Sequence, residues 1–214
     1  MPASSVDCKL LNLDAVRKAV LNTKPYHYAI APDVLDRSTW SSITRDFPAI
    51  KSGGSFPLTT LTYGPAFDQL CQELLSKEFE QIVEEKFGLA LSALPTMLTV
   101  RGHGRSKADG KIHTDSKEKV ITVLLYLNEE WTQPGGRLRV LRGKNDLQDY
   151  AAEIPPLMGQ MLLFKRCDYS WHGHEPCEGE RRSVQLNWAS SDRYTKYEGF
   201  RHKLSAFFKG NKEY

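Results

Sequence analysis

The segment that most constrains the fold is residues 120–127, which read VITVLLYL. Apolar side chains stand at both odd and even positions of this run. In a strand, odd and even side chains point to opposite faces, so this strand would be apolar on both faces and has to be covered on both. The run therefore predicts a sheet in a sandwich with helices outside.

The remaining patterns place helices before residue 95 and strands after it. We expect helices over residues 14–21, 32–45 and 67–87, and a last helix in the tail over 197–208. Strands are expected over residues 97–101, 120–128, 138–141, 161–165 and 183–188. This order indicates an α+β fold, mainly β, with helices packed on one face of an antiparallel sheet or barrel. A single domain results, with a helical support region (1–95), a core (96–190) and a helical tail (191–214).

Composition limits the class of protein further. The formal net charge of +3 over 214 residues is weak, so we expect no nucleic-acid partner. The four cysteines form no C-x-x-C pair, which excludes a zinc ribbon and a thiol redox motif. No apolar run is long enough to span a membrane, and we find no signal peptide. We therefore expect a cytoplasmic protein without a membrane partner.

Three residues of metal-ligand type form a recognisable set. His113 and Asp115 are two positions apart, so on an extended backbone both side chains reach the same ion. With the distant His172 they make a 2-His-1-carboxylate set, which is typical of non-haem iron(II) and leaves coordination sites open. On its own, H-x-D also occurs in exposed polar turns.

The strand over residues 182–188 adds a cation. One face carries Arg182, Val184, Leu186 and Trp188, and the other Ser183, Gln185 and Asn187. We expect the apolar face to point inward, which buries Arg182 and calls for a carboxylate partner, either on a ligand or on Glu153. Arg181 would then lie on the polar face, at the surface. Thr122, Leu124 and Tyr126 share one face of a neighbouring strand, and two hydroxyls there could bind the same ligand carboxylate.

These residues, with Tyr126-Leu127-Asn128, Gly135-Gly136-Arg137-Leu138-Arg139 and Leu162–Phe164, resemble the 2-oxoglutarate/iron(II) oxygenases, most of all the prolyl 4-hydroxylase branch. The resemblance covers about residues 96–190. It implies a double-stranded β-helix (jelly roll) with supporting N-terminal helices. It further implies that His113, Asp115 and His172 bind iron(II). Arg182 would hold the distal carboxylate of 2-oxoglutarate beside Tyr126 and Thr122, and Leu138 and Trp188 would line the pocket.

Two features depart from that family. Arg101 stands near a position where the family often has a tyrosine, and we expect it to contact an anionic part of a substrate. The loop over residues 104–111 is longer, and serves either as a rim over the site or as a solvated loop. His172 keeps the spacing to the arginine that the family shows, so His174 is expected at the rim of the pocket, although H-x-H also occurs in zinc and cupin sites.

The resemblance implies a hydroxylase of an unactivated C–H bond that uses iron(II), 2-oxoglutarate and O₂, with ascorbate as a supporting reductant. The expected substrate is a small molecule or a peptide, with proline, free or in a peptide, as the first choice. Alternatives are another amino acid, a sugar or a lipid, oxidative demethylation of nucleic acid, and a non-catalytic barrel that only binds.

Overall fold

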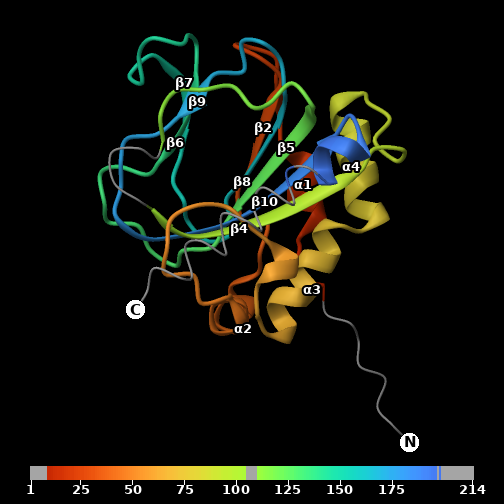
Figure 1. Ribbon diagram of the computed structural model, residues 1–214, viewed down its shortest axis with the longest axis vertical. Coiled ribbons are helices and arrows are strands. Elements are labelled where there is room, and N and C mark those ends of the chain that lie inside the picture. The colour runs from red at the N-terminus through yellow and green to blue at the C-terminus, as the bar shows by residue number, and fades with distance from the viewer. Residues whose placement is uncertain (1–8, 105–109, 197, 199–214) are drawn as a thin grey trace, which may run out of the picture.

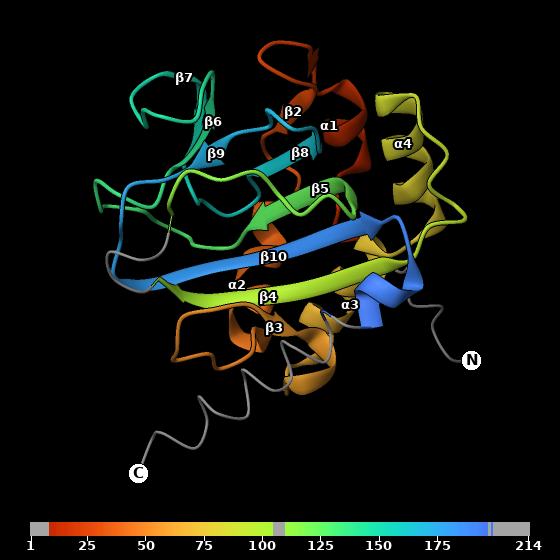
Figure 2. The same ribbon diagram turned by 45° about the horizontal axis from the view of Figure 1, so that its top comes forward.

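The computed structural model describes residues 9–104, 110–196 and 198, and it consists of three layers. The main sheet has seven strands in the order β1-β2-β8-β5-β10-β4-β3. The small sheet has three, β7-β6-β9, and lies over one face of the main sheet (Figures 1 and 2). Helices cover the other face. The main sheet comprises β1 (Leu21–Asn22), β2 (Tyr28–Ala31), β3 (Phe56–Pro57), β4 (Thr96–Gly104), β5 (Lys119–Tyr126), β8 (Met161–Lys165) and β10 (Gly179–Ala189), and the small sheet β6 (Leu138–Leu141), β7 (Tyr150–Ile154) and β9 (His172–Gly173).

This arrangement, with antiparallel pairs throughout the named strands, is the predicted jelly roll with supporting helices. The labelled helices are α1 (Leu13–Lys18), α2 (Trp40–Asp46), α3 (Pro65–Leu74) and α4 (Lys77–Phe87), with 3₁₀ turns at Arg37–Thr39 and Leu58–Thr60. Residues 192–196 are also helical. None of these helices is both long enough and apolar enough to cross a membrane.

The predicted helix over residues 67–87 is in fact two helices. The Ser76 side chain accepts a hydrogen bond from the Phe79 backbone N–H at 3.2 Å, which caps the start of α4. Gly88 ends α4 in the left-handed conformation, with φ at 62°. Apolar spacing continues across the break because α3 and α4 pack on the same core, so periodicity alone does not reveal it.

The N-terminal region was predicted to be helical, but it also contributes β1, β2 and β3 to the main sheet. The β2 segment has only four residues, which is too short to produce a clear alternation. The helix predicted over 32–45 begins only at Trp40. The predicted tail helix over 197–208 lies outside the described residues except for residue 198.

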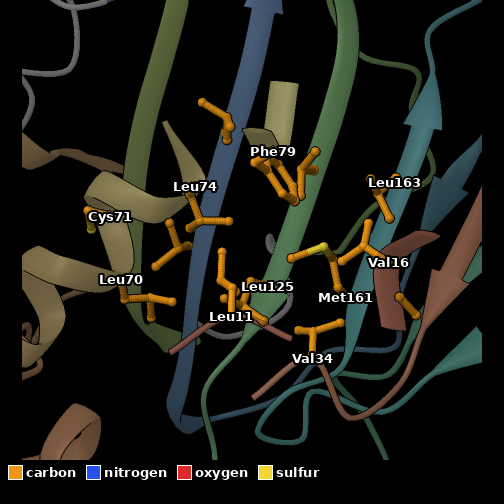
Figure 3. Close-up of a cluster of buried hydrophobic side chains, with 14 of the residues drawn as sticks. Leu11, Val16, Val34, Leu70, Cys71, Leu74, Phe79, Leu125, Met161 and Leu163 are labelled. Carbon is orange, nitrogen blue, oxygen red and sulfur yellow. The ribbon is translucent and has the colours of Figure 1, made fainter. Parts of the chain in front are cut away.

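The main sheet separates two apolar clusters. On the helix side, Val123 and Leu125 pack with α3, α4 and α1 residues such as Leu74, Phe79 and Val16 (Figure 3). On the other side, alternate residues of the same strands form a second cluster between the two sheets; it contains Tyr26, Tyr28, Leu124, Tyr126, Leu138, Val140, Ile154, Leu162 and Phe164. Strand β5 is therefore buried on both faces, which confirms the prediction from its sequence. The second interior opens into the pocket described next.

Candidate metal centre and co-substrate pocket

The backbone holds the H-x-D segment directly against β9. The His113 N–H donates to the His172 carbonyl at 3.0 Å, and the His172 N–H donates back to the His113 carbonyl at 3.0 Å. One step further, the His174 N–H donates to the Gly110 carbonyl at 2.8 Å. Gly110 has a φ of 86°, and a Cβ there would lie 2.3 Å from the His174 carbonyl oxygen, so only glycine fits this approach. These contacts bring two segments 59 residues apart in sequence into a fixed pairing.

The pairing gathers the three predicted ligands. One ligand atom from each of His113, Asp115 and His172 lies within 4.8 Å of the others. Each imidazole also has its other nitrogen engaged: Nδ1 of His113 with the Lys111 carbonyl at 2.8 Å, and Nδ1 of His172 with the Ser170 carbonyl at 3.0 Å. A carbonyl can only accept, so Nδ1 carries the proton and Nε2 keeps its lone pair for a cation. The three side chains therefore fit a divalent metal ion.

The charge states of these groups suit the same role. Burial opposes ionisation of Asp115, but Lys119, His172 and the Thr122 hydroxyl outweigh it and lower its pKa to about 2. Burial lowers the pKa of His172 to about 4, although Asp115 acts in the opposite direction. Near neutral pH the site thus presents a carboxylate and a neutral imidazole, which are the forms that bind metals.

A cavity of about 300 Å³ extends from this cluster between the two sheets. The polar side of β10, which carries Arg181, Ser183 and Gln185, forms one wall. The pairing of β10 with β5 and β4 sets Ser183 beside Tyr126 and Arg101, away from the metal cluster. Leu138 of the small sheet lines the cavity, as predicted. His174 also lines it, but is buried.

The prediction for the arginine was wrong by one residue. Arg181 is buried; its Nε donates to the Gly136 carbonyl at 2.9 Å, and its guanidinium lies over the Tyr126 ring at 5.2 Å and reaches the Tyr126 hydroxyl at 3.4 Å. Arg182 points to the opposite face, where it pairs with Glu180 at 2.8 Å and lies over Phe47. The apolar face of β10 is covered by helices, and the pocket is on its polar face.

Two further predicted contacts also differ because the pocket lies on the polar face of β10. Trp188 does not line the pocket: it is 1% exposed and stacks on Phe79 of α4 at 6.4 Å on the helix side. Thr122 does line it, but its hydroxyl donates to Asp115 at 2.5 Å and accepts from Asn187 at 2.7 Å, so it contacts one of the three candidate metal ligands.

Several lining residues were not predicted. Ser183 has a buried hydroxyl with no hydrogen-bond partner in the described structure. Lys119 forms an ion pair with Asp115 at 3.1 Å. Tyr194 and Glu198 lie at the rim. The row of polar residues at alternate positions 183, 185 and 187 was a usable signal, since an interior strand keeps such a row only where it faces a polar cavity.

A jelly roll that holds two histidines and a carboxylate at one end of a cavity, with a buried arginine at the other end, is typical of the mononuclear iron oxygenases. Comparison with known proteins agrees: the sequence model of the 2OG-Fe(II) oxygenase superfamily matches residues 100–189. No curated protein sequence matches the chain. Among solved structures, a Pseudomonas putida prolyl-4-hydroxylase is 18% identical, covering 77% of this chain and 92% of its own, with a TM-score of 0.51. A prolyl 4-hydroxylase from Phytophthora capsici is 17% identical, covering 83% of this chain and 68% of its own, with a TM-score of 0.54.

The chain therefore resembles the 2-oxoglutarate/iron(II) oxygenases over residues 100–189, and its fold is that of the prolyl 4-hydroxylases. It is a dioxygenase that uses iron(II), 2-oxoglutarate and O₂ to hydroxylate an unactivated C–H bond. Bound iron(II) and 2-oxoglutarate supply the oxidising power for this reaction, and the protein supplies position and exclusion of water.

Proposed function

We propose that this oxygenase hydroxylates proline, either free or within a peptide. The observation that carries the proposal is the convergence of His113, Asp115 and His172 at one end of a cavity that has a buried arginine at the other. The likeness of the fold to two prolyl 4-hydroxylases supports proline as the substrate.

The side chains divide into two groups in this proposal. His113, Asp115 and His172 hold iron(II) through two neutral imidazoles and one carboxylate. Arg181 binds the distal carboxylate of 2-oxoglutarate, helped by the hydroxyls of Tyr126 and Ser183. Arg181 has donors left after its contact with Gly136, and the partnerless Ser183 hydroxyl needs an acceptor, so a carboxylate between them satisfies both.

The remaining groups orient and protect the substrate. Burial raises the pKa of Tyr126, which keeps its hydroxyl protonated and able to donate to the carboxylate. Arg101 lies in the same row across the sheet as Ser183 and Tyr126. There it contacts an anionic group of the substrate or co-substrate. Leu124 and Leu138 supply the apolar part of the wall, which excludes water from the reacting atoms.

The test is succinate release by the iron-loaded protein with 2-oxoglutarate and O₂. Free L-proline and proline-containing peptides are the probes, with mass spectrometry to detect the added oxygen atom. We expect release to rise with a proline substrate and to be lost in His113→Ala. Stimulation only by another amino acid, a sugar, a lipid or alkylated DNA would overturn proline as the substrate but keep the oxygenase. Loss of succinate release in Arg182→Ala but not in Arg181→Ala would overturn the assignment of the carboxylate site.

A further inference from the structure

The inner face of β10 has a second half that the proposed roles do not use. Ser183 lies at the carboxylate end of the pocket, whereas Asn187 lies four residues further along the strand, beside Thr122 of β5. Asn187 is completely buried and Thr122 is 1% exposed. Two uncharged polar side chains so deeply buried need a reason to be there, since burial of polar groups is costly without specific partners.

Their partners form a continuous chain of hydrogen bonds that ends on Asp115. The Gln185 side-chain N–H donates to Asn187 Oδ1 at 2.9 Å, Asn187 Nδ2 donates to Thr122 Oγ1 at 2.7 Å, and Thr122 Oγ1 donates to Asp115 Oδ2 at 2.5 Å. A hydroxyl has one proton. Because Asn187 occupies a lone pair of the Thr122 oxygen, that proton is directed at Asp115. Asn187 thus sets the direction of the Thr122 bond.

The other carboxylate oxygen has a different neighbour. Lys119 Nζ lies 3.1 Å from Asp115 Oδ1, and the two side chains are only 12% and 10% exposed. One oxygen of the carboxylate is therefore held by a neutral hydroxyl and the other by a cation. A neutral donor can orient a metal ligand without opposing the metal. A cation at the same distance repels a divalent ion, and does so strongly where little water screens it.

We propose that Thr122 and Asn187 are positioning residues that orient Asp115 for the metal, and that Lys119 is a resident cation that competes with the metal for the same carboxylate. The inference rests on the proposed role of Asp115 as a metal ligand. It assigns opposite effects to two side chains that touch one carboxylate. A purely structural role would give the same sign for both, since loss of either contact would then disturb Asp115.

The experiment is titration of the protein with Mn(II), a redox-inert stand-in for iron(II), by calorimetry without 2-oxoglutarate. We expect Thr122→Val to bind Mn(II) roughly 10- to 100-fold more weakly, the usual cost of losing a group that orients a metal ligand. Thr122→Ser, which keeps the hydroxyl, should restore binding. Asn187→Leu should weaken binding less, and should add nothing in the Thr122→Val background, because it acts only through Thr122. Lys119→Met should bind Mn(II) more tightly than wild type.

Thr99→Val is the matched control, because Thr99 is a buried threonine on the same inner face, two strands from β5, and should leave Mn(II) affinity unchanged. Wild-type Mn(II) affinity in Thr122→Val, or an undiminished Asn187→Leu effect in that background, would overturn the positioning role. Weaker binding in Lys119→Met would overturn the competition. Asp115→Ala separates these failures from failure of the proposed function: if that variant binds Mn(II) like wild type, Asp115 is not a ligand at all.

Discussion

On one face of β10, Val184, Leu186 and Trp188 pack beneath the helices, whereas on the other Ser183 lines the pocket and Asn187 contacts Thr122. All five are at most 1% exposed. Burial therefore does not distinguish the two faces of this strand, but the chemistry of the side chains does. The helix side is an apolar core that stabilises the domain. The pocket side is a polar interior, which we propose binds a metal ion and the carboxylate of the co-substrate. We therefore expect mutations on the two faces to have different effects.

The largest expected effect is on the helix side. Trp188→Ala should lower the free energy of unfolding by about 3–5 kcal/mol, because it removes a large, fully buried side chain and leaves a cavity beside Phe79. Urea unfolding measures this. Gln185→Ala, three residues earlier in β10 and on its other face, should cost no more than about 1 kcal/mol. Equal losses for the two variants would contradict the division into a stabilising and a functional face.

A slightly smaller effect should come from pH, through the pocket side. Burial lowers the pKa of His172 to about 4, from an ordinary value of 6.5. Between these values the unfolded chain binds a proton that the folded protein does not. The stability of the metal-free protein should therefore fall as the pH drops through this range, by on the order of 3 kcal/mol. Asp115 acts in a lower window: its stabilisation is present above its ordinary value of 3.8 and is lost as the pH falls toward about 2.

Unfolding free energies of the metal-free protein at several pH values check this expectation. His172→Phe should flatten the dependence between about pH 6.5 and 4. His27→Gln, which changes an exposed histidine, should retain it. A wild-type slope in His172→Phe would show that another group is responsible.

The smallest expected effect concerns two adjacent arginines, and it distinguishes most directly between the two faces of β10. Arg181→Met should raise the 2-oxoglutarate concentration for half-maximal succinate release by roughly 10- to 100-fold, because a charge-assisted contact contributes about 1.5–3 kcal/mol. Arg182→Met removes the same charge from the other face, together with an ion pair to Glu180 that is partly exposed. It should leave this concentration unchanged within about two-fold. The reverse result would mean that the polar face of β10 is not the co-substrate wall.

The convergence of the three candidate metal ligands could be predicted because their signal is local. In H-x-D, two residues on an extended segment share a face whatever surrounds them, and a distant histidine completes a recognisable set. The both-sided burial of β5 was equally readable, since apolar residues at odd and even positions leave no other arrangement. The break between α3 and α4 was harder to predict. Ser76 ends the run of helical backbone and caps α4, but the apolar spacing continues across it.

The arginine could not be assigned this way, and the reason is physical. Alternation divided β10 into two faces correctly, with Arg181 on one and Arg182 on the other. The apolar face is the one expected to point toward the site, since interiors are usually apolar. This domain has two interiors, and the packing of helices on one side and the small sheet on the other decides which face meets the pocket. An irregularity in the pairing of β10 with β4 between Glu180 and Ser183 adds to the difficulty at the arginines themselves.

The chain's own residue order thus predicted the candidate ligand set, the α+β class and the alternation of each strand, because these depend on spacing along a single backbone, whereas the jelly roll followed from the resemblance to a family. Only the tertiary structure decided that Arg181 faces the cavity, that Trp188 belongs to the apolar core beneath the helices and that the Thr122 hydroxyl donates a hydrogen bond to Asp115. Those assignments depend on which layer covers which face and on contacts such as Thr122 to Asn187, between residues 65 positions apart.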